Sequence, residues 1–172
     1  MANTIVIYFS HSANDATFNG PYVREKGNTQ IAAEAIKDAL SCDIFRVELS
    51  DKYKGMAWYT NKEKLRKTMS GKAVEVKKLL DSISEYANVF ICGPCWWGSY
   101  PTAIFAQIKK LKFKGKRVMC LVTHEDSNPE GCLDIQKKLR GAKFGRHFLV
   151  RGDEVHQRLP QIVHWACVQN GE

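Results

Sequence analysis

NVFICGPCWWGSYP, residues 88–101, decides the fold because it joins a strand-like run to a loop of unusual composition. Residues 88–93 are mostly apolar at successive positions, as expected for a strand covered on both faces in a parallel sheet. The loop that follows, residues 94–101, is bounded by glycine and proline and holds two adjacent tryptophans. Two indoles are costly to leave in water, so they either pack under the loop or cover a flat ligand. Core packing is the favoured role for one of them.

The same alternation of short apolar runs and amphipathic stretches extends along the chain. Strands are predicted at five runs, Thr4–Phe9, Asp43–Leu49, Asn88–Gly93, Arg117–Thr123 and His147–Arg151. Helices are predicted where apolar residues recur at helical spacing, over Thr29–Leu40, Ala73–Tyr86, Thr102–Leu111, Gly131–Leu139 and a last segment with Pro160 in its first turn. Between Leu49 and Gly71 the pattern weakens into a polar, basic connection, with some helix expected near Lys62–Met69.

Strands and helices that alternate in this way imply an α/β fold with right-handed crossovers. We therefore predict a three-layer sandwich, in which a five-stranded parallel sheet carries helices on both faces, built as a single domain over residues 1–172. Ligands of such doubly wound sheets bind outside the carboxyl ends of the strands. That rule directs attention to three loops, which follow Phe9, Gly93 and Val122.

The composition limits the classes of function. No apolar run approaches the roughly 20 residues that cross a bilayer, and no basic leader is evident, so a cytoplasmic protein without membrane contact is expected. The six cysteines are then expected to be reduced, and the five histidines show no zinc-ligand spacing with them, so no metal site is predicted. The net charge of +8 suits solvated helix ends or the steering of anionic partners, and no nucleic-acid-binding motif is present.

The first and third loops are polar. After Phe9 come Ser10-His11-Ser12, a segment of 14 residues and then Gly27-Asn28-Thr29 at a helix start. Hydroxyl groups and glycine at a strand-to-helix turn suit a phosphate, which backbone N–H groups and the positive end of the helix dipole would hold. Capping of the helix by Asn28 or Thr29 explains the same residues equally well. Residues 123–131 form either a loop around a ligand edge or a plain surface turn.

Taken in order, these stretches resemble the flavodoxin family over nearly the whole chain. They are similar to a short flavodoxin-like branch with an insertion in the phosphate loop and a Pro-x-Trp-Trp-Gly loop. The residues that carry the resemblance are Tyr8-Phe9-Ser10, Gly27-Asn28-Thr29, Pro94-Cys95-Trp96-Trp97-Gly98, Phe113-Lys114-Gly115-Lys116, Thr123-His124-Glu125 and Arg151-Gly152. Asp126 and Asn128 depart from the pattern, because relatives often carry glycine at these positions.

The resemblance implies that the protein binds FMN non-covalently for redox chemistry. The site residues that it implies are Ser10, Ser12, Gly27, Asn28 and Thr29 for the phosphate, Pro94, Cys95, Trp96, Trp97 and Gly98 for the isoalloxazine ring, and Thr123, His124 and Glu125 for its pyrimidine edge. The implied reaction is electron transfer with a redox partner protein, or NAD(P)H-dependent reduction of a small quinone-like acceptor. Catalytic residues are not assigned, and a homodimer, as in many flavin reductases, is left open.

Two alternatives stay open. A flavin-free interaction module of the same fold is favoured by Asp126, Asn128 and the basic surface. Cys92-Gly93-Pro94-Cys95 spells a thioredoxin-type motif, which would make the protein a thiol–disulfide oxidoreductase. This reading is less favoured, because Cys92 ends an apolar strand and residues 96–101 delay the helix that would activate Cys95. We predict that these thiols do not catalyse the reduction of insulin disulfides.

Overall fold

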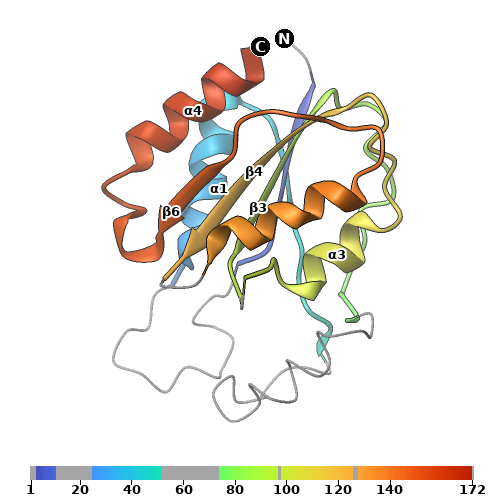
Figure 1. The fold of residues 1–172 in the computed structure, drawn as a ribbon, viewed down its shortest axis with the longest axis horizontal. Coiled ribbons are helices and arrows are strands. Elements are labelled where there is room, and N and C mark those ends of the chain that lie inside the picture. The colour runs from blue at the N-terminus through green and yellow to red at the C-terminus, as the bar shows by residue number, and fades with distance from the viewer. Residues whose placement is uncertain (1–2, 11–24, 52–73, 97, 126–127, 172) are drawn as a thin grey trace.

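A computed structural model of the chain describes residues 3–10, 25–51, 74–96, 98–125 and 128–171. Its centre is a parallel sheet with the strand order β2-β1-β3-β4, in which β5 and β6 both pair with the outer edge of β4 (Figure 1). The strands are β1 (Thr4–Tyr8), β2 (Asp43–Arg46), β3 (Asn88–Pro94), β4 (Arg117–His124), β5 (Lys143–Phe144) and β6 (Phe148–Arg151). The helices are α1 (Asn28–Leu40), α3 (Thr102–Ile108), α4 (Leu159–Gly171) and the 3₁₀ helices η2 (Pro129–Lys138) and η3 (Gly152–Glu154).

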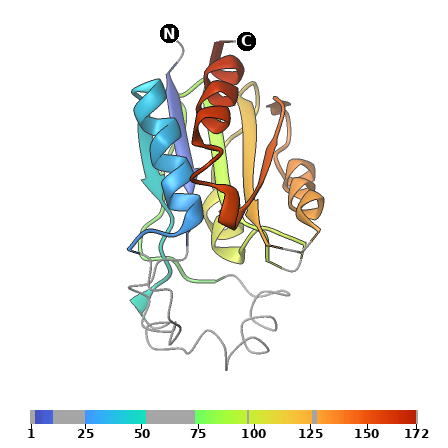
Figure 2. The same ribbon diagram turned by 90° about the vertical axis from the view of Figure 1, so that its left-hand side faces the viewer.

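Helices cover both faces of the sheet, so the predicted three-layer α/β fold is confirmed (Figures 1 and 2). Side chains alternate between the faces along each strand. Ile7 and Ile91 belong to the core under α3 and η2, whereas Val6 and Phe90 belong to the core under α1 and α4. Because both faces are buried, the strands read in the sequence as nearly continuous apolar runs.

The sheet has six strands rather than the predicted five, because the fifth position is occupied by two short strands. Phe144 pairs with Val118 and Phe148 pairs with Leu121. Between these two pairs, the outer segment that contains β5 and β6 advances by four residues, whereas β4 advances by three. One extra residue in an edge strand is a bulge, which interrupts the ladder and bends the chain. The predicted strand His147–Arg151 is therefore only the second half of this edge.

The predicted helix over Ala73–Tyr86 is wrong, since residues 74–86 contain no helix. Their backbone groups have partners elsewhere in the fold. Val76 forms an antiparallel bridge with Leu49. The fully buried side chain of Gln107, in α3, accepts the N–H of Leu80 over 3.0 Å and donates to its carbonyl over 3.1 Å. These tertiary hydrogen bonds replace the helical ones that the apolar spacing suggested.

The other helices that were predicted within the described residues are present with shifted ends. The segment predicted at Gly131–Leu139 is the 3₁₀ helix η2, which starts two residues earlier, at Pro129. In α4, Pro160 lies in the first turn as predicted. The helix expected near Lys62–Met69 lies outside the described residues. Within the described ranges, no helix is long and apolar enough to cross a membrane.

Candidate functional site

The carboxyl ends of β1, β3 and β4 lie next to one another at one end of the strands, on the side away from the labelled chain ends (Figure 1). We call this end the carboxyl edge of the sheet. Backbone hydrogen bonds join the three segments where the strands end. The N–H of Phe9 donates to the carbonyl of Cys92 over 3.1 Å, and the N–H of Cys95 donates to the carbonyl of Thr123 over 2.7 Å. The three loops that the sequence singles out therefore begin side by side.

The first loop leads into the first turn of α1. Gly27 is the N-cap residue, in extended conformation, and forms no side-chain cap. The first N–H groups of a helix have no partner within the helix, so other groups must satisfy them. The buried side chain of Ser10 supplies one partner, because its Oγ accepts the N–H of Gln30 over 3.1 Å. Ser10 thus ties the end of β1 to the start of α1.

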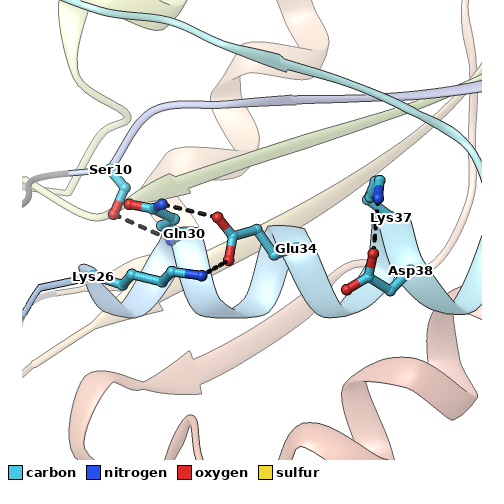
Figure 3. A network of polar contacts seen from close by, with 6 residues as sticks. All are labelled: Ser10, Lys26, Gln30, Glu34, Lys37 and Asp38. Carbon is cyan, nitrogen blue, oxygen red and sulfur yellow. Dashed lines mark hydrogen bonds and ion pairs between the residues drawn. The ribbon is translucent and has the colours of Figure 1, made fainter.

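Charged groups beside this helix start form a short network (Figure 3). Lys26 Nζ lies 2.6 Å from Oε2 of Glu34, and Nε2 of Gln30 donates to Oε1 of the same carboxylate over 2.8 Å. Burial acts to raise the pKa of Glu34, but hydrogen bonds from Lys26 and Gln30 outweigh it and hold that pKa below its ordinary value. The first turn of α1 has no acidic residue, so the positive end of its dipole remains favourable for an anion.

Side chains also join the helix start to the third loop. The hydroxyl oxygens of Thr29 and Thr123, which are 94 positions apart in the chain, lie 2.7 Å from each other, and both residues are buried. Asn28 lies beside Gly152, which follows β6. A Cβ on Gly152 would come within 2.5 Å of Nδ2 of Asn28, so glycine at this position leaves room for the Asn28 amide.

The aromatic loop is a tight turn. The backbones of Trp96 and Ser99 exchange two hydrogen bonds, of 2.8 Å and 3.1 Å. Gly98 closes the turn with a φ of +76°, a left-handed conformation that glycine adopts without steric cost. A Cβ on Gly131, in the first turn of η2, would overlap the carbonyl oxygen of Gly98. The two glycines together allow the loop to lie directly against η2.

Aromatic side chains pack between this turn and the core of the protein. Trp96 is half-buried and meets Phe9 edge to face, with ring centroids 5.4 Å apart and planes at 83°. Tyr100 is fully buried, and its hydroxyl donates to the carbonyl of Leu121 over 3.0 Å. Trp96 is therefore a packing residue at least on one side, which is the role expected for one of the two indoles. Trp97 lies outside the described residues.

Cys92 and Cys95 lie in different cores, on opposite faces of the sheet. Cys92 is fully buried in the core under α1 and α4, and burial raises the pKa of its thiol well above the ordinary value. Cys95 belongs to the core under α3 and η2, where its Sγ donates to the carbonyl of Asn128 over 3.5 Å. A hydrogen bond with Cys95, together with burial, also raises the pKa of Cys132. Two buried thiols in separate cores on opposite faces of the sheet are not placed for disulfide exchange.

The described part of the third loop is partly exposed. His124 is half-buried, and its Nδ1 lies 3.2 Å from the carbonyl oxygen of Glu125, whose side chain is exposed. Asp126 and, in the first loop, Ser12 lie outside the described residues. Pro94 is half-buried at the end of β3. Apart from Ser12 and Trp97, the predicted site residues are described and lie at this one edge.

Three residues that shape the edge were not selected from the sequence. Gln30 showed no signal, because only the fold brings its N–H to Ser10. Cys132 resembles, in the sequence, one more apolar position of the helix predicted at Gly131–Leu139, although its thiol contacts Cys95. Gly131 did carry a usable signal, since glycine is unfavourable near a helix start unless another backbone approaches closely. Together these contacts suit a ligand with an anionic end at α1 and a flat body at the aromatic loop.

A protein-family model described as Flavodoxin matches residues 20–164. Among curated proteins, none matches the chain.

Solved structures share the fold. A protein classed as a flavoprotein from Bacteroides uniformis is 23% identical, with a TM-score of 0.68 over 92% of this chain and 98% of that chain. A flavoprotein from Lactobacillus acidophilus in complex with FMN is 18% identical, with a TM-score of 0.63 over 91% and 98% of the two chains. A Fusobacterium nucleatum flavodoxin bound to flavin mononucleotide is 12% identical, with a TM-score of 0.55 over 99% and 98%.

Proposed function

The chain belongs to the flavodoxin family, and from this premise we propose that it binds FMN non-covalently at the carboxyl edge of the sheet and uses it for redox chemistry. The observation that carries the proposal is the junction of the three loops at Thr123, whose carbonyl binds the N–H of Cys95 and whose hydroxyl meets that of Thr29. Two structural relatives, from Lactobacillus acidophilus and Fusobacterium nucleatum, are FMN complexes. A phosphate-tailed flat ring suits an edge where a helix start lies near an aromatic loop.

The phosphate end of the site is the start of α1. Ser10, Gly27, Asn28 and Thr29 surround it, and the absence of acidic residues in the first turn favours an anion. The hydroxyl of Thr29 is engaged with Thr123. We therefore assign Thr29 the task of fixing the helix start against the third loop, while backbone N–H groups donate to the phosphate. Ser12 completes this group in our assignment.

The ring end of the site is the aromatic loop with the third loop. Pro94 to Gly98 line the isoalloxazine, and Thr123 to Glu125 close its pyrimidine edge. Gly98 and Gly131 allow backbone to approach closely there. The exposed carboxylate of Glu125 places negative charge near the ring, which disfavours additional negative charge on it. When bound, FMN supplies the capacity to accept and release electrons, and the protein positions it and excludes water.

The test is a titration with FMN, followed by quenching of flavin fluorescence and by the visible absorption spectrum. We expect one FMN per chain, and we expect riboflavin, which lacks the phosphate, to bind at least about tenfold more weakly. Ser10→Ala should weaken FMN binding about fivefold, because the hydroxyl that positions the Gln30 N–H is lost. Ser84→Ala is the matched control, since this exposed residue precedes β3 at the opposite edge of the sheet.

The same titration separates the proposal from a flavin-free interaction module. Protein that is purified colourless and does not respond to added FMN would support the module. Equal affinity for FMN and riboflavin would contradict the assignment of the phosphate to α1.

We propose a redox task in one of two forms, which a turnover assay distinguishes. Rapid oxidation of NAD(P)H by the FMN-loaded protein, with a small quinone as acceptor, would identify an enzyme. Slow turnover despite bound FMN would identify a carrier that exchanges electrons with a partner protein. All six cysteines are free thiols, which supports a reducing compartment such as the cytoplasm.

A further inference from the structure

A hollow lies at the end of the sheet opposite to the proposed FMN site, among residues that precede β4 and β5. It has a volume of about 590 Å³ and forms where α3 and η2 end. Both helices end on the right-hand side of Figure 1. Its apolar part is made by Phe105, Ile108, Leu111 and Phe113. The last three are buried, and Phe105 is half-buried, so part of its side chain remains accessible from the hollow.

Every other described residue that lines the hollow is a cation. These residues are Lys109, Lys112, Lys114, Lys138 and Arg140, and all five are exposed. Among the described residues, no acidic side chain lines the hollow and none of these five cations takes part in an ion pair. The Nζ of Lys138 lies 5.5 Å from the centroid of the Phe105 ring, which is within reach of a cation–π contact.

The five cations form the rim of the hollow and the four apolar residues form its floor, and together they determine which kind of molecule can bind. Five like charges around an apolar floor create a concentrated positive potential, which attracts anions. A purely inorganic anion would leave the apolar floor in water, and a neutral apolar molecule would leave the charges uncompensated. The volume falls within the roughly 300–1,000 Å³ typical of small-molecule sites.

We infer that this basic hollow binds a small organic anion, in which an apolar or aromatic body carries a sulfonate, phosphate or carboxylate group. The body rests on Phe105 and its neighbours, and the anionic group faces the lysines and Arg140. The site is separate from the proposed FMN site, because its residues precede β4 and β5 whereas the FMN loops follow the strands. An anion site at this hollow would also assign a function to the lysine-rich stretch 109–117, which has no role in the proposed redox chemistry.

The test is isothermal titration calorimetry of the full chain with naphthalene-2-sulfonate, in the presence of saturating FMN so that the other edge does not contribute. Naphthalene-2-methanol and inorganic sulfate are the comparison probes. We expect the sulfonate to bind at least about tenfold more tightly than either one, and more weakly in 300 mM than in 20 mM salt.

Two variants locate the binding. Lys112→Gln/Arg140→Gln removes two rim charges and should weaken sulfonate binding about three- to thirtyfold. Phe105→Ala should weaken it at least about fivefold, since it removes an aromatic face from the floor. Lys37→Gln/Arg158→Gln is the control, because it removes one lysine from α1 and one arginine directly before α4, the two helices on the other face of the sheet. It should leave binding within twofold of the unmodified chain.

Three results would overturn the inference. The first is equal loss of affinity in the rim variant and in the control. The second is no detectable binding at millimolar sulfonate. The third is tighter binding of a hexaglutamate peptide than of the sulfonate, which would make the hollow a protein-docking surface. Because the variants report the location, the result does not depend on whether the proposed FMN site is correct.

Discussion

Substitution of Gly93 by alanine tests how the aromatic loop is supported. Gly93 lies near the end of β3, and a Cβ there would stand 2.5 Å from Cδ1 of Ile104 and 2.7 Å from Cδ1 of Tyr100. Ordinary contacts of a Cβ begin near 3.4 Å. Both neighbours are fully buried, so they have no open space into which to withdraw.

The overlap requires shifts of about 0.7–0.9 Å in two packed side chains. Overpacking of this kind lowers the free energy of unfolding by about 1–3 kcal/mol. In a chain of this size each kcal/mol corresponds to about 2–4 °C, so the unfolding midpoint should fall by about 2–12 °C. Tyr100 follows the turn Trp96–Ser99 directly, so its displacement should also weaken FMN binding. We expect a loss of about three- to tenfold, from a penalty of about 1 kcal/mol at the loop.

The assay is thermal unfolding followed by circular dichroism, with the FMN titration repeated on the same preparation. Gly171→Ala is the matched control, because a Cβ there has no atom within 4 Å, and it should behave as the unmodified chain does. If Gly93→Ala shows the midpoint and the FMN affinity of the control, Tyr100 and Ile104 do not fix the loop and the reasoning is refuted.

Three further predictions concern buried groups. Gln107→Leu should lower the free energy of unfolding by about 2–4 kcal/mol in urea denaturation, because the N–H and carbonyl of Leu80 both lose their partner; an unchanged midpoint would show that water replaces the amide. Burial raises the pKa of Cys120 from 9.0 to about 12, so the thiol ionises at lower pH in the unfolded chain than in the folded chain. The contribution of this thiol to the free energy of unfolding is therefore fully present below pH 9 and is lost as the pH rises from 9 to 12. Denaturation at several pH values should therefore show that the free energy of unfolding falls less between pH 9 and 12 in Cys120→Ala than in the unmodified chain. An equal fall in both would refute the raised pKa. Native chain treated with Ellman's reagent at pH 8 should react quickly at exposed Cys167 and not at buried Cys92, and rapid labelling of Cys92 found by peptide mass would contradict its burial.

Much of the fold could be predicted from the sequence, because buried parallel strands produce continuous apolar runs such as Val89–Cys92. Two features could not. The segment 74–86 has the apolar spacing of a helix. Its hydrogen bonds, however, go to the backbone of Glu48 and Ser50 and to the side-chain amide of Gln107, which only the fold brings near. The split of the sheet edge into β5 and β6 depends on one extra residue between Phe144 and Phe148, and a local pattern does not reveal it.

The candidate site was predictable at the level of loops and less so at the level of atoms. Because ligands of doubly wound sheets bind at the carboxyl ends of the strands, the sequence alone selects the loops that carry Ser10, Trp96 and Thr123. It does not show that the hydroxyl of Thr123 is engaged with Thr29, because the two residues lie far apart in the chain. Interactions of this kind depend on how the layers pack, and sequence spacing does not encode them.

The most direct test of the central claim is a crystal structure of the chain grown with FMN. We expect the phosphate at the start of α1, beside Ser10 and Asn28, and the isoalloxazine between the aromatic loop and Thr123–Glu125. Flavin density anywhere else on the molecule, or an edge in which Trp96 fills the space assigned to the ring, would contradict it.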